Sequence, residues 1–155
     1  YHYFPVIRLA DIYLLYAEAM NEAYGPNDAA DLGWTALEAL NKVRTRAGIT
    51  VPYTTTSQTE MTKKIRNERR VELAFEDQRY FDLRRWKDAK DEESLPMYGC
   101  NVFMTKGERD LFYKPVPVSD VLTCFAEKTY FWPIDRSELE KNVRLTQNPG
   151  WQSQK

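Results

Sequence analysis

The 155-residue chain has one histidine and two cysteines. Because His2 is the only imidazole base and lies close to the chain start, the sequence disfavours a Ser–His–Asp or Cys–His catalytic arrangement. Cys100 and Cys124 do not form a metal-ligand pattern with this single distant histidine. They can remain free thiols or form a disulfide in an oxidising compartment. The acidic run Asp88, Asp91, Glu92 and Glu93 could attract calcium, but it lacks a calcium-loop pattern and is better read as a solvated turn. We predict no metal site and no cofactor.

Long uncharged apolar runs are also missing. No stretch of about 18 apolar residues without a charge exists, so we predict no membrane-spanning helix. The start, YHYFPVIRLADIYLLYAEAM, lacks the basic leader and small-residue cleavage site of a signal peptide. A net charge of −1 predicts no nucleic-acid partner, since such a partner usually requires a basic footprint. The chain opens just before a predicted helix, and we expect it to be part of a longer protein.

Aromatic residues are plentiful, at 14% of the chain, within a composition that is 43% apolar and 29% charged. These proportions predict a soluble globular domain with a real core rather than a disordered chain. Aromatic rings supply core volume, and any left exposed can form flat binding surfaces.

Apolar residues at helical spacing predict helices over about 5–24 and 29–47, a third from about 58, and a continuation after a bend over 77–86. Ser57 and Glu60 have the spacing of a capping box at the start of the third helix. In the first helix, one broad apolar face is expected to be buried: Val6, Leu9, Ile12, Tyr13, Tyr16, Met20 and Ala23. Asp11, Glu18 and Glu22 form a narrow acidic stripe opposite, bordered by Ile7, Leu14 and Leu15. Such a helix is packed on two sides, as in a helical array.

The second half of the chain is less regular. After the helical core, about 5–87, we expect an irregular region with short edge strands over about 88–133, because prolines interrupt its β-prone runs. Asp135 is expected to cap a short helix within a C-terminal segment of about 134–151. The predicted fold is mainly α, with tetratricopeptide-like helix pairs, long irregular loops and a short β-hairpin.

The segment IRNERRVELAFEDQRYFDLRRW, residues 65–86, is densely charged and places carboxylates on the same helical line as Ile65 and Phe75, where a core is expected. Glu68, Glu72 and Glu76 are one turn apart and would repel one another if unpaired. Neighbouring arginines suit bidentate pairing with such carboxylates. We favour a structural ion-pair network clamping the third helix to its continuation, over a ligand site or a catalytic acid–base pair. Its expected members are Glu68, Arg69, Glu72, Glu76, Arg79, Asp82 and Arg84.

Four segments occur in the order seen in the C-terminal region of the SusD/RagB family: PVIRLADIYLLYAEAMNE, ALEALNKVRTRAGI, the charged segment above, and FWPIDRSELEKNVRLTQNPGW. The chain resembles that family over residues 4–49, 58–87 and 129–151. The resemblance implies a non-catalytic, glycan-binding lipoprotein on the outer face of a Gram-negative outer membrane. Such proteins deliver oligosaccharides, or sometimes peptides, to a SusC-like TonB-dependent transporter. It also implies a longer protein, whose remaining part would carry the lipid anchor and much of the ligand site.

No binding residue follows from the family motifs, so candidates come from position in the chain. Tyr98 and Asn101, in an expected irregular segment, are the first choice, followed by Trp34 and Tyr53. Aromatic faces stack on pyranose rings, and amides bind their hydroxyls. Trp86 and Trp151 belong to the scaffold motifs and are expected to be buried.

Two other functions stay open. The chain can be a helical-repeat module that contacts the transporter without its own ligand site. It can also be a glycoside hydrolase remnant that uses Glu68 and Glu72, although no convincing acid–base site supports this.

Overall fold

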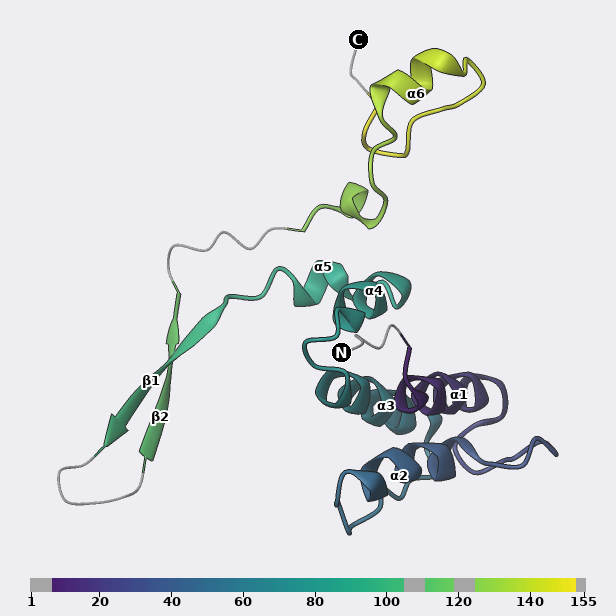
Figure 1. Ribbon diagram of the computed structural model, residues 1–155, viewed down its shortest axis with the longest axis vertical. Coiled ribbons are helices and arrows are strands. Elements are labelled where there is room, and N and C mark those ends of the chain that lie inside the picture. Colours follow the sequence, from purple (N-terminus) through teal and green to yellow (C-terminus); the bar gives the residue numbers. More distant parts are fainter. Residues whose placement is uncertain (1–6, 105–110, 119–124, 153–155) are drawn as a thin grey trace, which may run out of the picture. The chain divides into compact units, whose positions relative to one another are not determined.

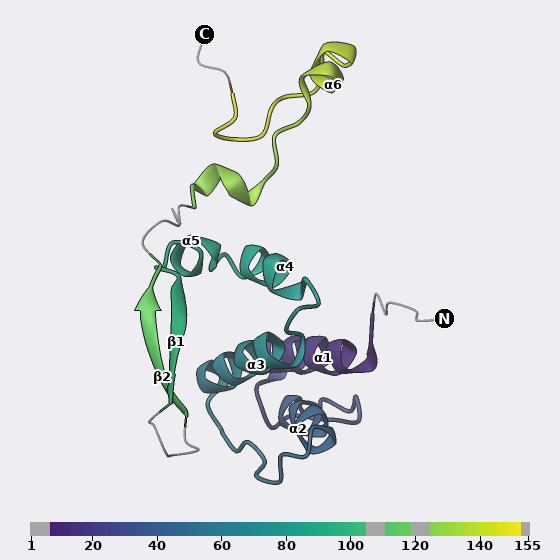
Figure 2. The same cartoon turned by 60° about the vertical axis from the view of Figure 1, so that its left-hand side comes forward.

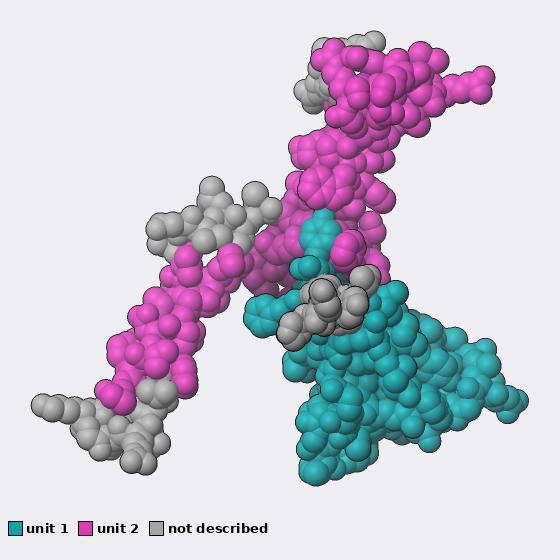
Figure 3. Space-filling model, viewed as in Figure 1, with its two compact units in different colours: residues 1–80 teal, residues 81–155 magenta. Residues whose placement is uncertain are grey.

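The computed structural model describes residues 7–104, 111–118 and 125–152. The chain divides into two compact units, unit 1 (Tyr1–Tyr80) and unit 2 (Phe81–Lys155), which Figure 3 shows in teal and magenta. Within the described ranges the chain is mainly helical, with one two-stranded sheet, and the predicted fold class is confirmed. None of the helices described is long and apolar enough to cross a membrane.

Unit 1 is built from three helices: α1 (Leu9–Tyr24), α2 (Ala36–Arg46) and α3 (Gln58–Glu72). Helix α1 packs against both of the others, as the two ribbon views show (Figures 1 and 2). Their shared core is apolar and buried, and contains Ala10, Leu14, Ala17, Met20, Ala36, Ala39, Leu40, Val43, Met61, Ile65 and Leu73. This core fixes the three helices as one body, on which the charged side chains of α3 are positioned.

The predicted buried face of α1 is partly wrong. Met20 is buried as expected, and Tyr13 and Tyr16 pack at the edge of the core. Leu9 and Ile12, however, are 64% and 48% exposed. The contact with α2 and α3 instead runs along Ala10, Leu14, Ala17 and Met20, so it includes Leu14, which was expected beside the acidic stripe. The two alanines let the helix axes approach closely.

Helix α2 begins seven residues later than the predicted start at 29. Thr35 caps it: the Thr35 hydroxyl accepts the Glu38 N–H at 3.0 Å, and the Thr35 N–H donates to the Glu38 carboxylate at 2.8 Å. This is a complete capping box, which satisfies two donors at the helix start. At α3, the predicted Ser57 cap is confirmed, with its hydroxyl accepting the Glu60 N–H.

Helix α3 ends in a turn that contains Phe75 and Asp77, both with positive φ (65° and 61°). The predicted bend and the continuation helix are confirmed, the latter as α4 (Gln78–Arg85). Phe75 was expected on the buried line of α3 but is fully exposed. The helical periodicity that placed it there ends at Leu73, so its side chain no longer follows that line.

Unit 2 contains a short helix α5 (Ala89–Glu92), strands β1 (Tyr98–Met104) and β2 (Leu111–Pro117), a 3-10 turn η1 (Glu127–Tyr130) and helix α6 (Arg136–Lys141). The strands form an antiparallel hairpin in which Tyr98 pairs with Pro117 and Asn101 with Lys114. The predicted short strands are confirmed, but the segment around Tyr98, expected to be irregular, is a regular strand. Asp135 caps α6 as predicted, accepting the Ser137 N–H at 2.8 Å.

The end of the described chain docks onto η1 through Trp151. Its indole N–H lies 2.9 Å from the carbonyl oxygens of both Lys128 and Phe131. Trp151 and Trp86 are nevertheless half-buried, so the expectation that both are buried is wrong. Their flat rings lie partly at the surface, where a polar atom can reach a backbone partner.

Candidate functional site

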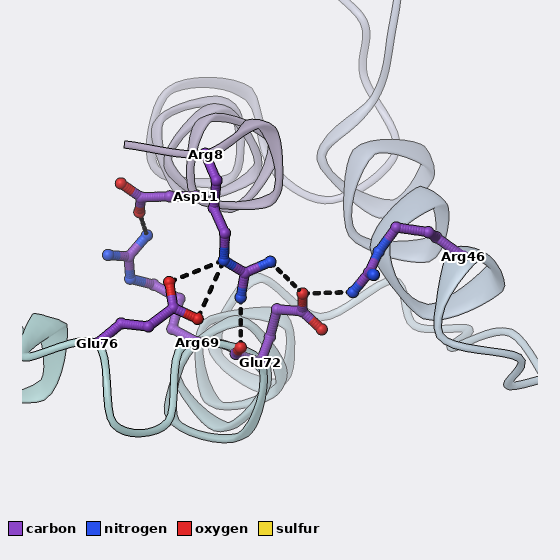
Figure 4. Close-up of polar contacts among 6 residues, drawn as sticks. All are labelled: Arg8, Asp11, Arg46, Arg69, Glu72 and Glu76. Atoms are coloured by element: carbon purple, nitrogen blue, oxygen red, sulfur yellow. Dashed lines mark hydrogen bonds and ion pairs between the residues drawn. The ribbon is translucent and has the colours of Figure 1, made fainter. Parts of the chain in front are cut away.

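A single guanidinium organises the charged end of α3. Arg8 is the residue before α1, and its Nε lies 3.0 and 2.8 Å from the two carboxylate oxygens of Glu76. Its Nη1 lies 2.6 Å from Oε1 of Glu72, and its Nη2 donates to the Glu72 carbonyl oxygen (Figure 4). Arg8 therefore joins the last residue of α3 to the turn that follows it.

Other charges of α3 pair with α1 and α2. Glu72 has a second partner, Arg46, whose Nη2 lies 2.5 Å from the same Oε1 (Figure 4). Glu68 pairs with Arg44 at 3.0 Å. Further along α3, the Arg69 guanidinium lies 2.8 Å from a carboxylate oxygen of Asp11.

These pairs change the predicted picture in two ways. Their partners lie outside residues 65–86, where the network was predicted: Arg8, Asp11, Arg44 and Arg46. Asp11 is buried against α3 rather than facing water. The sequence did hold a signal for these partners. Arg44 and Arg46, in the last turn of α2, and Arg8, immediately before α1, had no assigned carboxylate partner.

In unit 2, two members of the predicted network also have ion-pair partners. Asp82 accepts from Arg85 at 2.9 Å, and Arg84 donates to Glu93 at 2.9 Å. Arg79, the remaining member, lies in the first turn of α4 and belongs to unit 1.

Arg8 is a fixed positive charge in this site. Its hydrogen bond to Glu76 raises the pKa of Arg8 above the ordinary range; burial opposes this, and the bond to Glu72 adds to it. Arginine keeps its proton at any accessible pH. Glu68 and Glu72, the pair considered for hydrolysis, are both held in ion pairs with arginines of other segments: Glu68 with Arg44, and Glu72 with Arg8 and Arg46.

Trp34 lies in a different setting, just before the capping box of α2. The residue is 39% exposed, and its ring packs against Tyr13, with ring centroids 5.3 Å apart. The Lys42 ammonium lies 4.1 Å from the ring centroid. The ring borders an open surface hollow of about 530 Å³, whose other lining residues follow the outer face of α2: Glu38, Asn41, Lys42, Thr45 and Arg46. An aromatic face beside hydroxyl, amide and charged groups is a common sugar-binding composition.

Tyr53 is held in place by the same helix. Its backbone N–H donates to the Asn41 side-chain oxygen at 2.8 Å, and its carbonyl accepts from the Asn41 amide at 3.1 Å. The Arg44 guanidinium covers the ring, 3.6 Å from its centroid. Tyr53 is half-buried against the core and so has less free ring face than Trp34.

Tyr98 and Asn101 are both exposed on β1, but the strand does not bring them together. Successive side chains of a strand point to opposite faces, so residues three apart lie on opposite sides of the hairpin. Tyr98 shares its face with Cys100 and Val102, and Asn101 shares the other with Lys114. Cys100 is exposed, whereas Cys124 lies outside the described residues, as does any bridge between the two.

With this geometry in view, comparison with known proteins assigns the family. The model of the SusD family matches residues 2–151, and the chain belongs to that family. SusD-like protein P2 of Formosa agariphila is 30% identical over 158 aligned residues, which cover 97% of this chain and 26% of the relative. SusD-like protein P25 of the same organism is 41% identical over 91 residues, covering 52% of this chain and 15% of the relative.

Solved structures agree with the fold. A SusD-like protein from Bacteroides fragilis superposes with a TM-score of 0.73 at 29% identity, covering 94% of this chain and 25% of that one. A SusD superfamily protein from Parabacteroides distasonis gives a TM-score of 0.62 at 26% identity, covering 96% and 27%. The chain thus spans about a quarter of the length of these relatives.

Proposed function

We propose that this protein binds glycans at the cell surface for nutrient uptake, without cleaving them, and passes oligosaccharides to a SusC-like TonB-dependent transporter. Membership of the SusD family supports the proposal. The proposed location is the outer face of the outer membrane, with a lipid anchor in the longer protein. Because this chain spans about a quarter of its relatives, the whole ligand site would include residues outside it.

The observation that carries the proposal is the Trp34 ring beside the open hollow of α2. An exposed tryptophan can stack on the apolar face of a pyranose, while polar groups around it bind the hydroxyls. Thr45 and Lys42 are exposed and line this hollow. A bound sugar would replace the Lys42 ammonium over the ring, since this long side chain is free to swing into solvent.

Tyr98 and Asn101 remain a second proposed contact. Since they lie on opposite faces of the hairpin, one sugar would contact one of them, and we expect Tyr98 to contribute the stacking face. Tyr53 would act indirectly, by holding Asn41 at the edge of the hollow.

A glycan-array screen on the full-length protein would identify a ligand, and titration calorimetry would then measure its affinity. We expect Trp34→Ala to weaken binding by roughly tenfold, which corresponds to about 1.4 kcal/mol. Tyr24→Ala is the matched control, since Tyr24 is an exposed aromatic at the end of α1, outside the residues that line the hollow. Equal affinity of Trp34→Ala and wild type would remove this hollow from the ligand site.

The absence of hydrolysis is a separate part of the proposal. Incubation of the bound oligosaccharide with the full-length protein should release no shorter product. Hydrolysis that disappears in Glu72→Gln would contradict it and support the hydrolase alternative.

A module that contacts the transporter without binding glycan is the second candidate function. The exposed hairpin β1–β2 favours it, since a two-stranded ribbon is marginally stable unless something packs on it. Retention of the transporter by a full-length protein that binds no glycan would support this alternative.

A further inference from the structure

The two edges of the β1–β2 hairpin differ in their hydrogen-bonding capacity. The Val118 N–H donates to the Met97 carbonyl at 2.9 Å, directly before the paired strands begin. Met97–Val118 is therefore a hydrogen-bonded pair, and such pairs alternate with non-bonded pairs along an antiparallel ladder. It follows that Gly99 and Asn101 bond towards β2, whereas Cys100 and Val102 direct their N–H and C=O groups away from it.

The outer edge of β2 is blocked. Pro115 and Pro117 pair with Cys100 and Tyr98, which are non-bonded positions, so both prolines stand where β2 would offer N–H groups outwards. Proline has no N–H to donate, and proteins use it on edge strands to prevent further pairing. Lys114 adds a charge to the same strand.

The outer edge of β1 has none of these protections. Tyr98–Met104, YGCNVFM, contains neither proline nor charge, in a chain that is 29% charged. All seven residues are exposed. One face of the hairpin is apolar, with Tyr98, Val102 and Met104 from β1 and Tyr113 from β2, each more than half exposed. A neutral, unprotected edge beside an apolar face is a template for an additional strand.

We propose that β1 receives a third strand from an extended, uncharged extracellular segment of the SusC-like transporter. This inference rests on the proposed function, which supplies the partner. Outer-membrane barrels carry long extracellular loops, a source of extended segments at the height of a surface protein. A neutral strand suits β1 because β1 has no charged side chain that would require an opposite charge on its neighbour. Every second side chain of the added strand, if apolar, would cover the face that carries Tyr98 and Val102.

The test uses the full-length protein and its transporter, purified together from outer membranes. We expect Val102→Pro, which removes an outward N–H, to weaken transporter retention by about tenfold, the loss expected of one to two hydrogen bonds. Val102→Ala is the matched control, because it shortens the same side chain but keeps the N–H. It should change retention by less than about threefold.

Hydrogen exchange on the unmodified protein gives a second readout that does not depend on a variant folding. The Val102 amide should exchange rapidly in the free protein and about a hundredfold more slowly in the complex. Protection already present in the free protein at monomer mass would show that another part of its own chain covers β1. Protection together with a doubled mass would show pairing with a second copy. Either result overturns the proposal.

Different results would contradict the proposed strand addition and the proposed delivery function. If the transporter co-purifies but Val102 stays unprotected and Val102→Pro is retained normally, strand addition is wrong and the proposed delivery function stands. If no transporter co-purifies with the wild-type protein, the delivery function fails and the strand assignment fails with it.

Discussion

Arg69 and Asp11 form a buried ion pair, with Nη1 of the arginine 2.8 Å from Oδ1 of the aspartate. Their side chains are 2% and 10% exposed. Taking both charges out of water is costly, and their mutual attraction offsets much of that cost only while both are present. The pair therefore makes the α1–α3 contact depend on two specific side chains rather than on apolar area alone.

Removing one member of this pair should destabilise unit 1 strongly. We expect Arg69→Met to lower the free energy of unfolding by about 3 kcal/mol, since it leaves the Asp11 carboxylate buried without this partner. The double variant Asp11→Leu/Arg69→Met should be more stable than Arg69→Met alone, because no uncompensated charge remains. Urea denaturation followed by circular dichroism measures both. The exposed pair Glu138–Lys141 is the control cycle, with an expected coupling below about 0.5 kcal/mol. Additive effects at Asp11 and Arg69 would contradict the prediction.

Arg8 should contribute more to the free energy of unfolding than an ordinary surface charge does. Arg8→Ala removes the bonds to Glu72 and Glu76 together, and we expect a loss of about 2 kcal/mol of unfolding free energy. Arg136→Ala removes an arginine from an exposed pair with Glu140 and should cost less than about 0.5 kcal/mol. The same denaturation experiment compares them. Equal effects of the two substitutions would show that the Arg8 contacts add nothing beyond a surface pair.

The capping box of α2 predicts a pH dependence. The pKa of Glu38 is lowered from its ordinary value of 4.5, first because its carboxylate accepts the Thr35 backbone N–H and then through the Thr35 hydroxyl. A folded-state pKa below the unfolded value gives stability that is present above pH 4.5 and is lost as the pH falls through the folded pKa. A side-chain carboxyl NMR titration should therefore show Glu38 ionising below pH 4.5. Thr35→Ala removes the hydroxyl but keeps the backbone N–H, so it should move that midpoint part of the way upwards. An unchanged midpoint would mean that the hydroxyl does not hold the carboxylate.

Gly150 should tolerate no side chain. Its φ is +80°, and an added Cβ would lie 2.6 Å from the Lys128 Cβ. Gly150→Ala should thus displace the Lys128 backbone from the Trp151 indole, and shift or broaden the indole N–H resonance. Gly33→Ala is the control: its φ is +97°, but nothing lies within 4 Å, so it adds only left-handed strain of about 1–2 kcal/mol. An unchanged Trp151 resonance in Gly150→Ala would refute the prediction.

The sequence predicted most accurately those features that are set by residues close together in the chain. The Ser57 and Asp135 caps, the bend after α3 and the short strands all depend on residues within a few positions of one another. The predicted start of α2 was too early, because apolar residues before Thr35 suggested a longer helix. The capping box at Thr35 instead makes Ala36 the first residue of the helix.

The tertiary partners of the charges could not be read in the same way. Asp11 looks like a solvent-facing residue on a helical wheel, and only the position of α3 makes it a buried acceptor. Phe75 fails for the reverse reason, since its burial was inferred from a helix that ends before it. Tyr98 and Asn101 were grouped as loop neighbours, and the strand separates them by its alternation. Only Asp11 depends on which element packs against it, whereas Phe75 depends on where the helix ends and Tyr98 on whether its segment is a strand.

The bond between Arg8 and Glu76 spans 68 residues of sequence. It joins the entry of the first helix to the turn after the third, so it forms only when nearly the whole of unit 1 is present. On the ribosome, the first two helices would emerge and find each other while this closure was still missing. Until Glu72 and then Glu76 leave the exit tunnel, Arg8 would have neither of these carboxylate partners, and the α1–α2 pair would lack the contacts that α3 supplies.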